Sequence, residues 1–219
     1  MNDTSKTPSK SRQIPSSRQY CADRKYADIL YAYLQYQSKR DWDENQIEKG
    51  PRYLLRSDIN FTAFAAALDM SRQTVSKKFQ YLQDLKLIEY VKEEDKYYLT
   101  VLPKQDATLI PYDLLEFMVD TFSDRAYSVY CYLFNRHWAN SKKPFEFTYD
   151  QIKTHLGLST LTRSNDHVIS NILIMLANNH LIAYSLQTKT GEDQGNVKTT
   201  YKLESIRNTK PEIQKKEKC

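Results

Sequence analysis

The sequence contains few glycine and histidine residues, and it lacks the motifs shared by most phosphate-binding and metal-dependent enzymes. Only four glycines and four histidines occur among its 219 residues. No Gly-rich phosphate loop, GxSxG or HExxH motif is present. His155 and His167 have no carboxylate or thiol partners at the spacing of a metal site, so we interpret them as surface residues. A tyrosine nucleophile among the 17 tyrosines would need metal-binding histidine pairs, which are missing. We therefore expect no metal, no cofactor and no enzymatic activity.

Cysteines and long apolar runs are also scarce. Cys21, Cys131 and Cys219 are odd in number, far apart and outside any CxxC motif, which predicts free thiols in a reducing cytoplasm. No apolar run approaches the roughly 18 residues that a membrane-spanning helix needs. The first 19 residues are polar and do not resemble a secretory signal. These absences predict a cytoplasmic protein without membrane contact.

The net charge of +5 is concentrated at the two ends of the chain. Residues 1–25 carry six Lys or Arg against two Asp, and residues 205–219 carry five against two Glu. The ends therefore hold seven excess positive charges, and residues 26–204 have a net charge of −2. We interpret residues 1–24 as a disordered basic tail and residues 207–219 as a basic C-terminal tail, both able to reach phosphates.

The first half of the chain begins with an amphipathic helix and a charged loop. Between Tyr26 and Arg40, apolar residues recur every three or four positions, which is the spacing of one helix face. The segment from Asp41 to Lys49 is charged and ends at Gly50-Pro51, a dipeptide that stops helices and favours turns. We expect a loop there.

A helix-turn-helix pattern follows this loop. Asn60 is placed to cap a short Ala-rich helix, Asp69-Met70 forms the turn, and Ser71 is placed to cap a second helix. After Leu87 the pattern changes to two β-rich runs, LIEYV and YYLTVL, around the charged turn KEEDK. Such a hairpin after a helix-turn-helix is a wing.

The second half repeats this order. An amphipathic helix from Ala126 to Trp138 precedes a short helix that begins at Thr148, with Gln151 in position to complete a capping box. A long apolar helix comes next, followed by the runs LIAYSL and NVKTTYKLES around TGEDQG. Similar tetrapeptides recur at offsets of 99, 88 and 94 residues, and the change from 88 to 94 indicates a six-residue insertion, Thr160 to Asn165.

These patterns predict a mainly α fold with small β hairpins (α+β), arranged as tandem winged helix-turn-helix units. The predicted first unit spans residues 25–104 and recognises DNA. The predicted second unit spans residues 105–206 and mediates self-association, with DNA contact left open.

The second helix of the first unit carries the candidate DNA-binding residues. At 100° per residue, Val75, Phe79 and Leu82 share one side, and the polar residues form a separate arc without an acid. Arg and Gln side chains can recognise guanine and adenine edges, while Ser and Lys suit phosphate oxygens. The predicted DNA-binding residues are Ser71, Arg72, Gln73, Thr74, Ser76, Lys77, Lys78 and Gln80.

The long helix of the second unit has no fixed cation on the equivalent arc, and apolar residues surround most of its circumference. Surplus apolar surface indicates a partner, most simply a second copy of the chain, and we expect Ile174 at the interface of a homodimer. The alternative is a deeper core closed by Phe145, Phe147 and the aromatic helix from Tyr127 to Trp138.

The stretch SRQTVSKKFQYLQDLKLIEYV resembles bacterial members of the winged helix-turn-helix superfamily. Two such units without an evident ligand domain resemble the replication initiators of Gram-positive plasmids and phages. The resemblance implies binding to double-stranded DNA, a role in replication initiation or its control, and replication proteins as further partners. The wing tip from Lys92 to Lys96 is net negative, which departs from wings that contact the minor groove. A transcriptional repressor and a protein-binding adaptor remain the alternatives.

Overall fold

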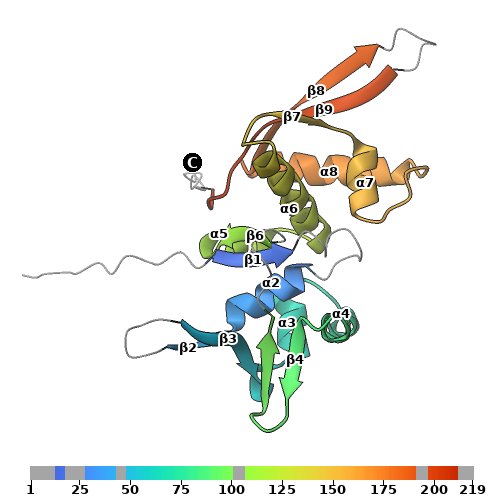
Figure 1. Cartoon of the computed structure of the whole chain (residues 1–219). Coiled ribbons are helices and arrows are strands. Elements are labelled where there is room, and N and C mark those ends of the chain that lie inside the picture. The colour runs from blue at the N-terminus through green and yellow to red at the C-terminus, as the bar shows by residue number, and fades with distance from the viewer. Residues whose placement is uncertain (1–12, 18–27, 43–47, 101–106, 191–196, 212–219) are drawn as a thin grey trace, which may run out of the picture.

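The computed structural model describes residues 13–17, 28–42, 48–100, 107–190 and 197–211 (Figure 1). The elements of the first half are β1 (Gln13–Ser17), α2 (Asp28–Gln37), β2 (Lys39–Trp42), β3 (Glu48–Leu55), the 3-10 helix η1 (Arg56–Asp58), α3 (Phe61–Ala67), α4 (Arg72–Asp84), β4 (Ile88–Val91) and β5 (Lys96–Leu99). Those of the second half are β6 (Ala107–Pro111), α5 (Tyr112–Thr121), α6 (Asp124–Ala139), β7 (Phe145–Phe147), α7 (Tyr149–His155), α8 (Ser164–Asn178), β8 (Ile182–Thr190) and β9 (Val197–Ile206). No helix in these ranges is long and apolar enough to cross a membrane.

The first unit has the element order helix, strand, helix, helix, hairpin, which is that of a winged helix. The Asn60 side chain accepts hydrogen bonds from the backbone N–H groups of Thr62 and Ala63, and Ser71 Oγ accepts one from Thr74 N–H at 3.0 Å. Asp69 turns the chain between α3 and α4 with a φ of 48°. Both predicted caps and the predicted helix-turn-helix are therefore confirmed.

The predicted wing is also confirmed, but it belongs to a larger sheet than expected. Strands β4 and β5 pair antiparallel, and β5 also pairs with β3, in the order β2-β3-β5-β4. The prediction of a loop from Asp41 to Lys49 is wrong at both ends of that segment, because Asp41 of β2 pairs with Lys49 of β3. Gly50, with a φ of 72°, continues β3 where a helix stop was expected.

The second unit repeats the order with α6, β7, α7, α8 and the hairpin β8–β9. Thr148 and Gln151 form the predicted capping box at the start of α7. Strands β7, β9 and β8 form a three-stranded sheet, and the β8–β9 hairpin projects from the body (Figure 1). The fold class is therefore α+β, as predicted.

Two terminal segments that were interpreted as tails contain ordered structure. Strand β1 pairs antiparallel with β6, so the prediction of disorder throughout residues 1–24 is wrong for residues 13–17. At the other end, the Tyr130 hydroxyl donates to the carbonyl of Arg207 at 2.8 Å, and Pro211 is buried. Residues 207–211 thus belong to the folded body.

The two units share one apolar core. Helix α2 contacts both α5 and α6, and the buried side chains form a single cluster that extends from Ile29 to Leu203. The linking elements β6 and α5 were not predicted as part of this core. Burial of both units against α2 and α6 gives the chain a defined arrangement of its two helix-turn-helix motifs.

A buried ion pair joins α4 of the first unit to α6 of the second. The Lys78 Nζ lies 2.7 Å from the Asp124 carboxylate, and their side chains are only 9% and 11% exposed. Burial raises the pKa of Asp124 to about 6, although Lys78 favours its charged form. The prediction that Lys78 contacts DNA is wrong, because Lys78 lies on the buried side of α4.

Replacing Lys78 by Met leaves the Asp124 carboxylate buried without its cation. We expect the free energy of unfolding at pH 7 to fall by about 2 to 4 kcal/mol, since removing one partner of a buried pair leaves an uncompensated charge. The double variant Lys78→Met/Asp124→Asn should recover at least half of this loss. Urea unfolding of the wild type, both single variants and the double variant measures the coupling. Equal stability of Lys78→Met and the wild type would contradict the assignment.

His155, interpreted as a surface residue, instead packs its ring on Tyr132 of α6, with ring centroids 4.4 Å apart. Burial lowers the pKa of His155 to about 4, against the raising effect of its hydrogen bond to the backbone of Ser128. The histidine is therefore neutral in the folded chain at pH 7.

A lowered folded-state pKa means that stability is present above the unfolded-state pKa and is lost as the pH falls. Between pH 7 and pH 4.5, His155 is protonated in the unfolded chain but stays mostly neutral in the folded chain. This difference lowers the free energy of unfolding by about 2 kcal/mol. We expect the wild type to lose this much more stability over that interval than His155→Gln does, as measured by urea unfolding at both pH values. Identical losses for the two proteins would show that His155 does not titrate differently on folding.

Candidate nucleic-acid interface

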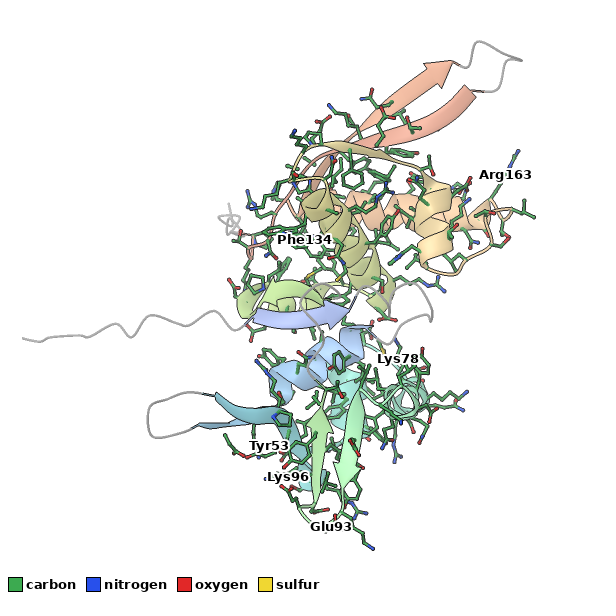
Figure 2. The ribbon with its side chains drawn as sticks, in the orientation of Figure 1. Tyr53, Lys78, Glu93, Lys96, Phe134 and Arg163 are labelled. Atoms are coloured by element: carbon green, nitrogen blue, oxygen red, sulfur yellow. The ribbon has the colours of Figure 1, made fainter. Side chains whose placement is uncertain are left out.

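The second helix of the first unit exposes a polar face that contains no acid. Val75, Phe79 and Leu82 are buried against the core, and this fixes the opposite side of α4 toward solvent. Figure 2 shows the side chains of α4 projecting outward at the edge of the molecule. We name this surface the α4 face, and its exposed residues are Arg72, Gln73, Ser76, Lys77 and Gln80.

The charges of the α4 face are not used within the fold. Arg72 and Lys77 make no ion pair in the part of the chain that the structure describes. Gln80 donates to Asp84 at 3.1 Å, which removes part of its hydrogen-bonding capacity; Asp84 itself is the last residue of α4, beyond the five residues of the α4 face. Two cations and one uncommitted amide, that of Gln73, therefore remain at the N-terminal end of α4.

Ser71 and Thr74, which were also predicted to contact DNA, are exposed but already bonded to each other. Their hydroxyl oxygens lie 2.8 Å apart, and Ser71 caps α4. They hold the first turn of α4 in shape and can still accept a contact at their free positions. Lys78 lies on the side of α4 that faces the second unit (Figure 2) and does not belong to the α4 face.

The wing of the first unit pairs Glu94 internally. Glu94 accepts from Tyr98 and lies 3.2 Å from Lys96, and these hydrogen bonds, that of Tyr98 most, lower the pKa of Glu94. The Lys96 ammonium lies 4.4 Å from the centre of the Tyr53 ring. Lys96 is thus engaged inside the sheet, whereas Lys92 is exposed, and the tip keeps its net negative charge. This arrangement disfavours a phosphate contact by the wing.

In the second unit, α8 buries one face and exposes another. Ile169, Leu173 and Leu176 are buried in the core, whereas Ile174 is 47% exposed. The alternative of a deeper core is therefore confirmed for most of α8, because Val168 and Met175 also pack against the core that contains Phe147, and it fails only at Ile174. His167 and Asn171 lie on the same exposed arc of α8 as Ile174, at helical spacing.

Sequence analysis missed one cation at this motif. Arg163 is exposed immediately before α8, and Figure 2 shows it pointing away from the body. Arg163 belongs to the predicted insertion, Thr160 to Asn165, and therefore has no counterpart on the arc of the first unit. The signal that could have found Arg163 is the absence of any acid from Thr154 to Asn165.

The two helix-turn-helix motifs lie at the same edge of the molecule. In Figure 1, α4 and the connection between α7 and α8 both lie at the right-hand side of the view. The buried pair between α4 and α6 holds the first motif to the second unit.

The described residues contain no group of three or more His, Cys, Asp or Glu side chains placed to hold a metal ion. No protein-family model matches the chain, and no significant match was found among curated proteins. Among solved structures, the chain is similar to the crystal structure of the Pi initiator protein in complex with iteron DNA. The identity is 13% and the TM-score 0.47, with 91% of this chain and 99% of that chain covered.

Proposed function

We propose that this chain is a sequence-specific binder of double-stranded DNA, with α4 of the first unit in the major groove. The observation that carries the proposal is the α4 face, an exposed acid-free surface on the second helix of a helix-turn-helix. A helix surface that is only solvated usually mixes acids with bases, whereas this face keeps two cations free of ion pairs within the described ranges.

The residue types of the α4 face suit distinct tasks at the DNA surface. Arg72 and Gln73 lie in the first turn of α4, the part of a recognition helix that contacts base edges. Arg forms paired hydrogen bonds with guanine, and Gln does so with adenine. Ser76 and Lys77 suit phosphate oxygens, which position the protein without selecting a sequence.

The proposed biological role is replication initiation or its control, as in mobile genetic elements. Its support is the architecture, because the described residues form two helix-turn-helix units and their connecting elements, without a separate ligand-binding domain. Footprinting on the DNA beside the gene separates the roles. Iterated repeats favour an initiator, a single palindrome over a promoter favours a transcriptional repressor, and no binding favours a protein-binding adaptor.

Removing the proposed base contacts should weaken binding to the preferred sequence. We expect Arg72→Ala and Gln73→Ala each to cost about 1 to 3 kcal/mol on the preferred site and little on unrelated DNA, since base contacts specify and phosphate contacts do not. Lys77→Ala should weaken both kinds of DNA alike. Fluorescence anisotropy at fixed salt concentration, with duplexes of both kinds, measures the difference.

The matched control is Lys143→Ala, which removes the same charge from an exposed position of the second unit. It should leave the preference between the two duplexes unchanged. Unaltered affinity of the Arg72→Ala/Gln73→Ala variant for the preferred site would falsify the proposed role of the α4 face.

We also propose that two copies associate through α8. The supporting observation is Ile174, an apolar side chain that stays exposed on an arc otherwise formed by polar residues. Burial of such a residue against its counterpart in a second copy gives the isologous contact of a two-fold dimer.

Placing a charge at this position should dissociate the dimer. We expect wild-type protein to sediment as a dimer at tens of micromolar and Ile174→Glu to sediment as a folded monomer, because a desolvated unpaired carboxylate costs several kcal/mol. Leu186→Glu is the control, since Leu186 is also an exposed apolar residue but lies on β8. A monomeric wild type, or a dimer that persists in Ile174→Glu, would exclude this interface.

A further inference from the structure

The connection between α7 and α8 holds an apolar side chain in solvent. Leu161 is 93% exposed, more than any other large hydrophobic residue in the described part of the chain. Its neighbours Thr160, Thr162 and Arg163 are exposed as well. We name residues 159–163 the α7–α8 loop. Because Leu161 buries almost no area in the chain, its position contributes almost no hydrophobic free energy to folding.

The α7–α8 loop is nevertheless fixed to both flanking helices. Lys153 of α7 donates from Nζ to the carbonyl of Thr160 at 3.1 Å, and Asn165 of α8 donates from Nδ2 to the carbonyl of Ser159 at 2.9 Å. The backbone N–H of Leu161 itself donates to Ser159 Oγ at 3.3 Å. These three bonds fix the backbone from Ser159 to Leu161, and the Leu161 side chain stays exposed.

The anchor of the loop is a buried lysine. Lys153 is 3% exposed, and besides Thr160 it contacts Asp150 at 3.0 Å and Asp166 at 2.5 Å. The one cation holds the loop and offsets part of the charge of the two acids that lie closest to it. The loop therefore presents hydroxyl groups, Arg163 and Leu161, without an acid of its own.

This composition fits DNA better than an apolar protein surface. Hydroxyl and guanidinium groups are typical phosphate contacts, whereas an apolar protein surface would need further exposed hydrophobic residues beside the leucine. In a bound helix-turn-helix, the beginning of the second helix enters the major groove, and the α7–α8 loop directly precedes α8. The apolar group that base pairs present in the major groove is the C5 methyl of thymine.

We propose that Leu161 recognises the C5 methyl group of a thymine in the major groove, while Arg163 contacts a phosphate beside it. The inference rests on the proposed DNA binding and adds a specificity-determining residue in the second unit. It also implies that both units contact the same duplex, each with a different kind of base contact.

The test removes the methyl group from the DNA and the side chain from the protein. In the site selected by the full-length wild type from random duplexes, each thymine is replaced in turn by deoxyuridine, which lacks only the methyl. We expect a three- to fivefold loss of affinity at one or two positions, the scale of one buried methylene. In Leu161→Ala the thymine and deoxyuridine duplexes should bind equally, at the weakened level.

Two controls separate this contact from others. Leu186→Ala, which truncates another exposed leucine, should keep the full deoxyuridine penalty, and so should Arg72→Ala at the same positions. A wild type that is indifferent to deoxyuridine everywhere overturns the proposal. So does a Leu161→Ala variant that keeps every penalty of the wild type. Failure of the wild type to select any DNA refutes the proposed function instead, and is thus distinguishable.

Discussion

The buried pair between Lys78 and Asp124 constrains the helix that carries the proposed recognition surface. A lysine on a helix next to DNA is expected to point outward, yet here it crosses to the other unit and lies 2.7 Å from a carboxylate. Burying both charges is unfavourable unless they stay together, so a shift of α4 against α6 that leaves either charge buried alone is strongly destabilising. The pair therefore fixes the direction of α4 as well as its distance from the second unit.

A second buried lysine has a comparable effect at the other motif. Lys153 engages Asp150 and Asp166, and the same ammonium holds the carbonyl of Thr160. In both units a lysine is thus buried against acid, while the arginine near the start of the second helix, Arg72 or Arg163, stays exposed. This division explains how residues 26–204, with a net charge of −2, can still present an exposed arginine at the start of each second helix.

The sequence predicted most of the local structure, because caps and periodicity are local signals. Asn60, Ser71 and the Thr148–Gln151 box were found because each bonds to backbone within three residues. The pairing of β1 with β6 could not be found this way, since nearly 100 residues separate the strands and the first has a polar composition. The order of β2 and β3 was hidden by Gly50-Pro51, which predicts a turn but here lies within a strand.

The error at Lys78 has a different origin. Its phase on α4 lies about 60° from Val75, so helical geometry alone places it near the buried side. The prediction nevertheless placed Lys78 in solvent, because lysines are seldom buried without a partner. The partner, Asp124, is 46 residues away in the sequence and gives no local signal. Arg163 was missed for another reason: its position relative to α8 depends on how the insertion folds, which the sequence does not show.

That insertion also makes the two units chemically different. The first unit presents Arg72 and Gln73, whose side-chain types are able to form directional hydrogen bonds with purine edges. The second presents an apolar side chain and neutral polar groups on a loop fixed by Lys153 and Asn165. A wrong base that leaves a buried donor unpaired costs the full desolvation free energy of that donor. Loss of a methyl contact changes the affinity only a few fold. A duplex bound by both units would then owe its strict base requirements to α4 and its graded preferences to the α7–α8 loop. The second unit could accordingly tolerate variation between related sites that the first unit would reject.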